Sequence, residues 1–227
     1  MAGDCVIIGL VSKGRENEIM EAYIAYLSEI LLVKENLKLV KEEAKKYYQS
    51  HSMKECGEMG LRLYASEHYP IQEVGIFLLG YSAHEFPWAL TFLKERVSQH
   101  ENWKVQEILA MAFDNHCKII GYETALPLIE EWLNNDCANV RRAASEGLRV
   151  WTSRPYFKDH PDVAIKLLSA HRQDKSLYVR KSIGNTLRDI SKKHGERVSD
   201  ELSAWDLSTK EVQQVYKLAN RFIESKK

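Results

Sequence analysis

No run of about 18 apolar residues, the length that a membrane span requires, occurs in this sequence of 227 residues. The apolar stretch at residues 5–11 follows an acidic residue and is too short for a membrane span or a secretory signal. Cysteines are few, and their spacing matches no common metal site. They are Cys5, Cys56, Cys117 and Cys137. These absences predict a cytoplasmic protein in a reducing compartment, with no membrane segment and no bound metal.

The motifs of common catalytic scaffolds are missing as well. We find no Gly-rich phosphate-binding loop, no pair of histidines at ligand spacing and no Ser/His/Asp order typical of a hydrolase. The formal net charge is +0, because 32 Lys and Arg balance 32 Asp and Glu. A balanced charge argues against a polycation that binds nonspecifically.

The balanced total hides an uneven distribution of charge along the chain. Residues 138–195 contain 13 Lys and Arg against 5 Asp and Glu, a net charge of +8, whereas residues 1–137 carry 13 against 21. Residues 196–227 are balanced. A basic block of this kind can form one positive face that neutralises phosphates.

A short motif occurs twice within the basic block, as VRRAASEGLR at 140–149 and VRKSIGNTLR at 179–188. The same frame extends backwards to Val105 and Ile71, at spacings of 35 and 34 residues. Spacings of this size are close to those of HEAT-type helical pairs, in which each pair buries its apolar face against its neighbours. The sequence therefore predicts an all-α protein, an α-solenoid (superhelix) of HEAT-like helical repeats, with these four positions buried.

We expect a single solenoid domain over residues 1–227 and a monomer. Apolar segments that precede the motif predict the first helix of each pair, at residues 88–97, 125–133 and 163–171. Residues 1–65 are expected to form N-terminal capping helices, residues 66–195 the repeats, and residues 196–227 a C-terminal capping helix.

Several bases recur at helical spacing in the two motif copies. Arg142 and Arg149 are seven residues apart, as are Lys181 and Arg188, so each pair shares one stripe of its helix. Parallel rows of bases on adjacent repeats fit an extended polyanion such as double-stranded DNA. The alternative is that such bases bond to neighbouring repeats. The expected DNA-binding residues are Arg141, Arg142, Arg149, Arg180, Lys181 and Arg188.

Three acids lie in successive motif helices: Glu107, Glu146 and Asp189. Positive neighbours are expected to lower the pKa of Glu146 and Asp189 and keep both ionised. An ionised carboxylate weakens plain phosphate binding, but it suits a cationic base or the oxocarbenium-like sugar formed when a glycosidic bond breaks. The alternative is that these acids form salt bridges between repeats.

At these residues the sequence resembles the HEAT-repeat DNA alkylation-repair glycosylases, the AlkC and AlkD superfamily. Residues 139–149 are similar to the V-R-R-x-x-S-E-G-x-R block of AlkC proteins, and residues 178–192 to their Y-V-R-R-S-V-A-N-N-L-N-D-I-A-K block. Residues 103–107 resemble the W-x-x-x-D/E signature of both branches. The specific resemblance covers residues 100–195.

The resemblance implies roles for individual residues. Glu107 takes the place of the principal catalytic acid, with Glu146 and Asp189 as further active-site acids. Trp103 would pack on the lesion or its deoxyribose, while Arg149 and Arg188 would face the DNA backbone. No metal or organic cofactor is implied.

Two departures from the family pattern bear on the branch and on activity. Asn185 stands where AlkD proteins have a second tryptophan, which favours the AlkC branch and leaves Asn185 as the contact to lesion or sugar. The Ser-Glu-Gly block runs into residues 148–151 instead of the usual Pro-rich segment, which leaves room for a divergent or inactive paralogue.

The resemblance implies a DNA glycosylase of base excision repair that removes N-alkylated, cationic purines such as 3-methyladenine or 7-methylguanine. Two alternatives remain open at this point. One is a noncatalytic HEAT-repeat protein that binds distorted or branched DNA, and the other is a scaffold for protein–protein contacts. A role in repair predicts a cytoplasmic, nucleoid-associated location.

Overall fold

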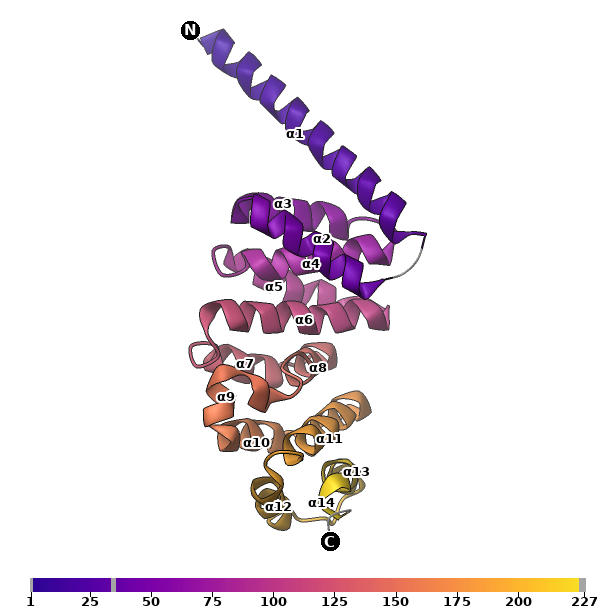
Figure 1. Ribbon diagram of the computed structural model, residues 1–227, viewed down its shortest axis with the longest axis vertical. Helices are drawn as coiled ribbons and strands as arrows, with labels where there is room; N and C mark the ends of the chain where they lie inside the picture. Colours follow the sequence, from indigo (N-terminus) through magenta and orange to yellow (C-terminus); the bar gives the residue numbers. More distant parts are fainter. Residues whose placement is uncertain (1, 34–35, 225–227) are drawn as a thin grey trace. The chain divides into compact units, whose positions relative to one another are not determined.

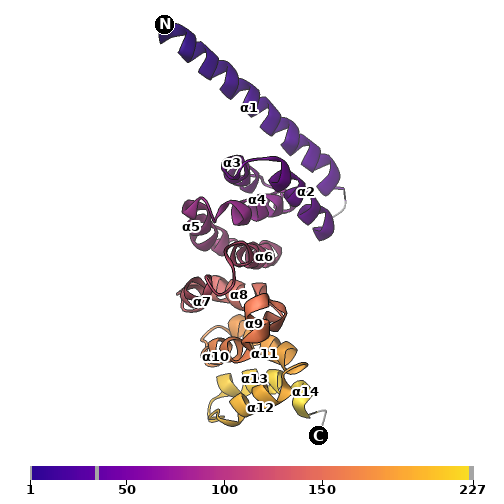
Figure 2. The same ribbon diagram turned by 60° about the vertical axis from the view of Figure 1, so that its left-hand side comes forward.

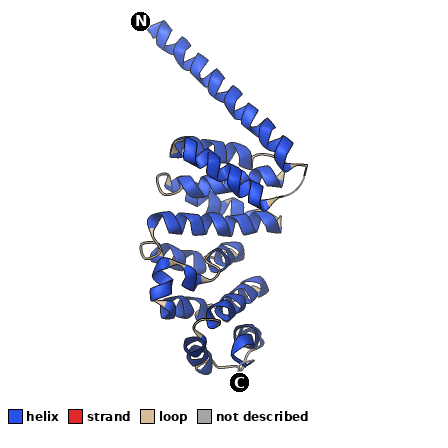
Figure 3. Cartoon of the chain, in the orientation of Figure 1, coloured by secondary structure: helices blue, strands red, loops and turns tan. Residues whose placement is uncertain are grey.

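The computed structural model describes the backbone of residues 2–33 and 36–224, and the side chains of 17–33 and 36–223. Every regular element in these ranges is a helix, and no strand occurs in them (Figure 3). The predicted all-α solenoid of HEAT-like repeats is thereby confirmed. Among the described residues, no helix is both long enough and apolar enough to cross a membrane.

The chain forms two compact units, residues 1–89 and residues 90–227. In the first unit, α1, α2 and α3 each contact α4 (Figure 1). The bounds of these helices are α1 Ala2–Leu31, α2 Leu37–Ser50, α3 Met53–Tyr64 and α4 Tyr69–Ser82. The start of α3 is set by a capping box, in which Ser52 and Glu55 satisfy each other's backbone N–H groups.

In the second unit, four helices lie next to one another in chain order (Figures 1 and 2). They are α6 (Trp103–Ile120), α8 (Ala138–Gly147), α11 (Leu177–Ser191) and α13 (Lys210–Ala219). The helices that precede them are α5 (Pro87–Glu95), α7 (Leu126–Leu133), α10 (Pro161–Ser169) and α12 (Gly195–Ser203). The three predicted first helices are therefore confirmed, with their ends shifted by at most two residues. Short helices complete the unit: η1 (Val97–Gln99), η2 (Trp151–Ser153), α9 (Pro155–Asp159) and α14 (Arg221–Glu224).

The predicted buried positions of the repeat frame are confirmed. Ile71, Val105, Val140 and Val179 are each at most 1% exposed. The frame also continues to Val212, which is 33 residues beyond Val179 and fully buried in α13. Residues 196–227 therefore do not form the single capping helix that we expected, because the described part of this segment contains residues of three helices, α12, α13 and α14.

The residue after each buried position of the frame is a side-chain donor with one common role. Its N–H group donates to the backbone carbonyl six residues earlier, in the turn before the helix. We call this contact the carbonyl clamp. It joins Gln72 to Ser66, Gln106 to His100 and Gln213 to Leu207 at 2.7 Å, Arg141 to Asn135 at 2.8 Å, and Arg180 to Asp174 at 2.6 Å.

One repeat is longer than the others. The distance from Val140 to Val179 is 39 residues, against 33 to 35 elsewhere in the frame, and the additional chain is taken up by η2 and α9. Val150 enters this segment in the left-handed conformation, with φ 58°, which is strained for a β-branched residue. Trp151 follows it, fully buried, and its Nε1 donates to the carbonyl of Ser145 at 3.2 Å.

The neighbouring helices share one register. Gly147 lies against the backbone of Ala110. Gly147 is seven residues beyond the buried valine of α8, and Ala110 is five residues beyond that of α6. In the same way, Thr186, seven residues beyond the valine of α11, contacts Ser145, five residues beyond the valine of α8. The Thr186 Oγ1 donates to the Ser145 carbonyl at 3.4 Å. The same register therefore relates α8 to α6 and α11 to α8.

Gly147→Ala should lower the stability of the protein. A Cβ atom at this position would overlap the carbonyl oxygen of Ala110, and overpacking of this kind costs about 1–3 kcal/mol. Gly195→Ala is the matched control, because nothing lies within 4 Å of its Cβ position. Urea unfolding followed by circular dichroism should show a lower midpoint for the first variant only, and equal midpoints would contradict the close approach of α6 and α8.

Candidate nucleic-acid interface

One face of α6, α8 and α11 remains uncovered by the packing of the repeats. A helix turns about 100° per residue, so the positions two and six residues beyond a buried valine, and nine where the helix is long enough, lie on the side opposite that valine. Every residue at these positions is exposed or half-buried. We call this the polar face, made of Glu107, Met111 and Asp114 on α6, Arg142 and Glu146 on α8 with Arg149 two residues beyond its end, and Lys181, Asn185 and Arg188 on α11.

Glu107 and Trp103 occupy one stripe at the start of α6. Asn102 caps this helix by accepting from the backbone of Lys104 at 2.9 Å, so Trp103 is the first helical residue. The indole is 61% exposed. Glu107 lies one turn later and is half-buried, and among the described residues its carboxylate has no hydrogen bond or ion pair. This end of the polar face thus holds an available carboxylate beside an exposed ring.

The other two predicted acids are joined to each other through a base. Arg149 lies 3.4 Å from Oε1 of Glu146 and 3.6 Å from Oδ2 of Asp189, so it bridges α8 and α11. The second oxygen of Glu146 accepts from Ser182 at 2.8 Å. No described contact connects this pair of acids with Glu107, so the three acids do not form one cluster.

Asp189 is surrounded by cations at the edge of the polar face. Its side chain is only 7% exposed, with Lys192 at 2.9 Å and Arg188 at 3.4 Å. Burial raises the pKa of Asp189, but the hydrogen bond from Lys192 and the charges of Arg188, Lys192 and Arg149 outweigh it and leave the pKa below its usual range. The predicted lowering of this pKa is confirmed, and for Glu146 and Asp189 the structure has the salt bridges of the alternative interpretation.

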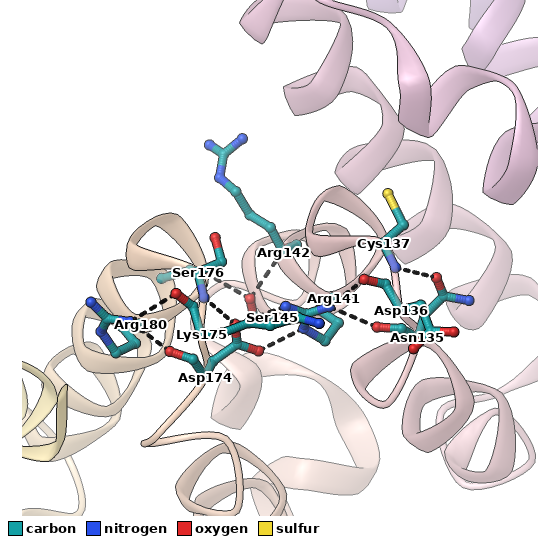
Figure 4. Close-up of polar contacts among 11 residues, drawn as sticks. Asn135, Asp136, Cys137, Arg141, Arg142, Ser145, Asp174, Lys175, Ser176 and Arg180 are labelled. Carbon is teal, nitrogen blue, oxygen red and sulfur yellow. Dashed lines mark hydrogen bonds and ion pairs between the residues drawn. The ribbon is translucent and has the colours of Figure 1, made fainter.

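Two of the six expected DNA-binding bases are structural. Arg141 is 5% exposed and forms a bidentate ion pair with Asp174 at 2.6 and 2.8 Å, in addition to its carbonyl clamp (Figure 4). Arg180 is 8% exposed and donates to Gln214 at 3.0 Å as well as to its clamp carbonyls. We correct the expectation for both residues, because their guanidinium groups are buried and occupied between repeats.

The remaining bases differ in how free they are. Arg142 points away from the buried network (Figure 4), and neither it nor Lys181 forms an ion pair within the described chain. Arg149 is 56% exposed although it bridges two acids. Arg188 is mostly buried, beside Asp189 and over the ring of Phe222 at 5.9 Å. Arg142 and Lys181 are therefore the bases most available to a phosphate.

Asn185 lies half-buried in the middle of α11, on the polar face between Lys181 and Arg188. Its amide has no hydrogen bond within the described residues. No contact brings it to Trp103, so its expected role at the lesion stays a prediction.

The sequence analysis missed Asp114, which lies on the same stripe of α6 as Glu107. Its oxygens accept from Tyr122 at 2.9 Å and from Arg154 at 2.6 Å. Burial raises the pKa of Asp114 above its ordinary value, despite the charge of Arg154. The sequence did contain a signal, since Asp114 stands nine residues beyond Val105, as Arg149 stands nine residues beyond Val140.

Potential metal ligands are dispersed in the described part of the chain. No group of three or more His, Cys, Asp or Glu side chains there is placed to hold a metal ion.

Comparison with known proteins gives a consistent result. Residues 14–219 match the family described as DNA alkylation repair enzyme. The chain is 44% identical to AlkD2 from Streptococcus mutans, with a TM-score of 0.86 over 89% of this chain and 98% of that one. The structure of smu.31 from Streptococcus mutans UA159 is similar at the same identity and coverage, with a TM-score of 0.84.

A shorter match connects the chain with an uncharacterized protein of Bacillus subtilis (strain 168), YhaZ, at 36% identity over 91 residues. This match covers 38% of the chain and 26% of the length of YhaZ, so the chain spans about a quarter of that relative. The resemblance to the AlkC branch rests on motifs within residues 100–195, whereas the match with AlkD2 extends over most of the chain.

Neighbouring arginines on α8 should respond differently to substitution. Arg141→Ala leaves Asp174 buried without its partner and should cost about 3–5 kcal/mol of stability. Arg142→Ala removes an unpaired side chain and should change stability by no more than about 0.5 kcal/mol. Urea unfolding of both variants measures the difference, and comparable losses would contradict the division into structural and free bases.

Proposed function

Because the chain belongs to the DNA alkylation repair enzyme family, we propose that its polar face binds double-stranded DNA and that it excises N-alkylated, cationic purines such as 3-methyladenine or 7-methylguanine. Such an activity belongs to base excision repair and would place the protein with the nucleoid in the cytoplasm. The observation that carries the proposal is the unpaired carboxylate of Glu107, one helical turn from the exposed indole of Trp103.

The free bases support the binding step. Arg142 and Lys181 occupy the same offset on adjacent helices, and packed helices lie about 8–10 Å apart. Two unpaired cations at this separation can contact successive parts of a phosphate backbone and release counterions. Arg149, seven residues after Arg142 and just beyond the end of α8, offers a third contact if it leaves its carboxylates.

The chemistry requires little from the protein. Alkylation on a ring nitrogen gives the purine a formal positive charge, so the electrons of the glycosidic bond can leave with the base without its protonation. The sugar then develops oxocarbenium character, which a fixed carboxylate such as Glu107 stabilises. Water adds to C1′ and yields an abasic site, and the same carboxylate can take up the proton that is released. The indole of Trp103 adds cation–π contact at the positive centre.

The second candidate function is binding of distorted or branched DNA without excision. A specific observation favours it: Arg149, Arg188 and Lys192 neutralise Glu146 and Asp189. Neither of these acids then offers a free negative charge to a sugar cation. In this account the polar face holds DNA, and Glu107 has no chemical role.

Binding should depend on the free bases of the polar face. Arg142→Ala combined with Lys181→Ala should weaken binding to all sequences alike and reduce the slope of log affinity against log salt by about 2, because two phosphate contacts are lost. Fluorescence anisotropy over a range of salt concentrations measures both effects.

The matched control is Lys158→Ala combined with Lys166→Ala, which removes the same charge from exposed positions on α9 and α10, outside the polar face. Equal losses in both double variants would show that only net charge matters. Absence of DNA binding by the wild-type protein would favour the protein scaffold.

Glu107→Gln should leave the fold and DNA affinity nearly unchanged and reduce release of alkylated base on the order of 10²-fold or more, as does loss of a preorganised electrostatic group. Incubation with methylated DNA and detection of the free base measures this. Glu130→Gln, the same change at an exposed position on α7, is the control.

Two results would lead to different conclusions. A wild-type protein that binds DNA but releases no base would establish the noncatalytic function. Full activity of Glu107→Gln would move the principal role to another acid, with Asp114→Asn, Glu146→Gln and Asp189→Asn as the variants to compare.

A further inference from the structure

A row of apolar side chains borders the polar face where its helices begin. The residues two positions before the buried valines are Trp103, Ala138 and Leu177, and Tyr178 follows the last of them. Tyr178 is 72% exposed, more than any other aromatic side chain that the structure describes in the second unit. A ring this exposed contributes little to packing, so its presence calls for another explanation.

The backbone that carries Tyr178 is firmly held. Arg180 donates to the carbonyls of Asp174 and Lys175 at 2.6 and 3.1 Å and reaches Gln214 on α13. The backbone N–H of Ser176 donates to Asp174 at 2.7 Å, and Asp174 is itself paired with Arg141 of the preceding repeat. The ring therefore projects from a start of α11 that is fixed between two repeats.

Unpaired positive charge surrounds this ring in the sequence. Lys175 and Lys181 lie three residues to either side of Tyr178, and both are exposed without an ion pair in the described chain. An aromatic ring among free cations is the arrangement by which proteins stack nucleobases while they neutralise the adjoining phosphates. An acidic peptide would also meet the charges, but the border is continuous with the face proposed to bind DNA.

We propose that Tyr178 is a stacking site for an unpaired nucleobase, so that the protein prefers DNA containing an unpaired base over fully paired duplex. The proposal rests on DNA binding by the polar face. Trp103 lies at the start of α6 and Tyr178 at the start of α11, and one helix, α8, lies between these two. At the usual spacing of packed helices, α6 and α11 are about 16–20 Å apart. At 3.4 Å per base step, the second ring contacts the strand about five or six nucleotides from the ring beside Glu107.

The test compares a fully paired duplex with one that carries a single bulged 2-aminopurine, by fluorescence anisotropy and by quenching of the 2-aminopurine. The wild type should bind the bulged duplex about tenfold more tightly and quench its fluorescence, because base–aromatic stacking contributes a factor of this order. Tyr178→Ala should lose both effects and keep the affinity for paired duplex. Tyr178→Phe, which retains the ring, should keep both.

The outcomes separate this inference from the proposed function. Equal affinity of the wild type for both duplexes, or a preference that Tyr178→Ala retains, would overturn the stacking site and leave excision intact. A preference that depends on Tyr178 in a protein that releases no alkylated base would support the stacking site and overturn the glycosylase activity. Failure of the wild type to bind either duplex would overturn both.

Discussion

The carbonyl clamp is the interaction on which the rest of this structure depends. A helix that follows a turn leaves backbone carbonyls of the turn without a partner, and a buried carbonyl without a hydrogen bond costs about 1–3 kcal/mol. In each repeat one side chain donates a hydrogen bond to such a carbonyl, six residues earlier in the chain. This side chain belongs to the residue directly after the buried valine or isoleucine. Because the same residue position fixes both the buried contact and the turn, α6, α8, α11 and α13 each begin two residues before their buried valine. Their common register brings equivalent stretches of neighbouring helices together, and the polar face follows from it.

The clamp also explains why the basic block divides into two kinds of residues. In α4, α6 and α13 the clamp residue is glutamine, whereas in α8 and α11 it is Arg141 or Arg180. A guanidinium group has donors to spare after it has bound a carbonyl, and these reach Asp174 and Gln214 in the next repeat. Part of the positive charge of residues 138–195 therefore stabilises the stack and is unavailable to a ligand. The charge that remains at the surface is smaller than the composition implies, and it lies mainly on Arg142, Lys181 and Arg149.

The repeat frame could be predicted from the sequence because valine or isoleucine recurs at near-constant spacing and small residues follow at fixed offsets. The different fates of Arg141 and Arg142 could not be predicted from charge, since adjacent residues on a helix point about 100° apart. The glutamines at the equivalent positions 72 and 106 were a usable signal, because an uncharged donor there indicates a structural role. The ion pair between Arg149 and Asp189 could not be predicted from the sequence, because it depends on how α8 and α11 pack against each other. The roles of Glu107 and Asn185 remain predictions, since no contact in the described chain tests them.

The long repeat between Val140 and Val179 has a consequence for how this fold can change in evolution. Val150, in the left-handed conformation, lies three residues beyond the end of α8 and directly precedes η2, and η2 and α9 precede α10, which resumes the pattern. Helix α8, which precedes this segment, packs on α6, and α11, which follows it, packs on α8. Residues can therefore be gained or lost most readily at the exposed end of this segment, residues 158–160, as in surface loops that tolerate insertion. Trp151 and Phe157 are fully buried and hold the rest of the segment in place. This segment also supplies Arg154 to Asp114 on α6. Relatives that differ in length here would keep the same scaffold and yet present a differently charged surface beside it.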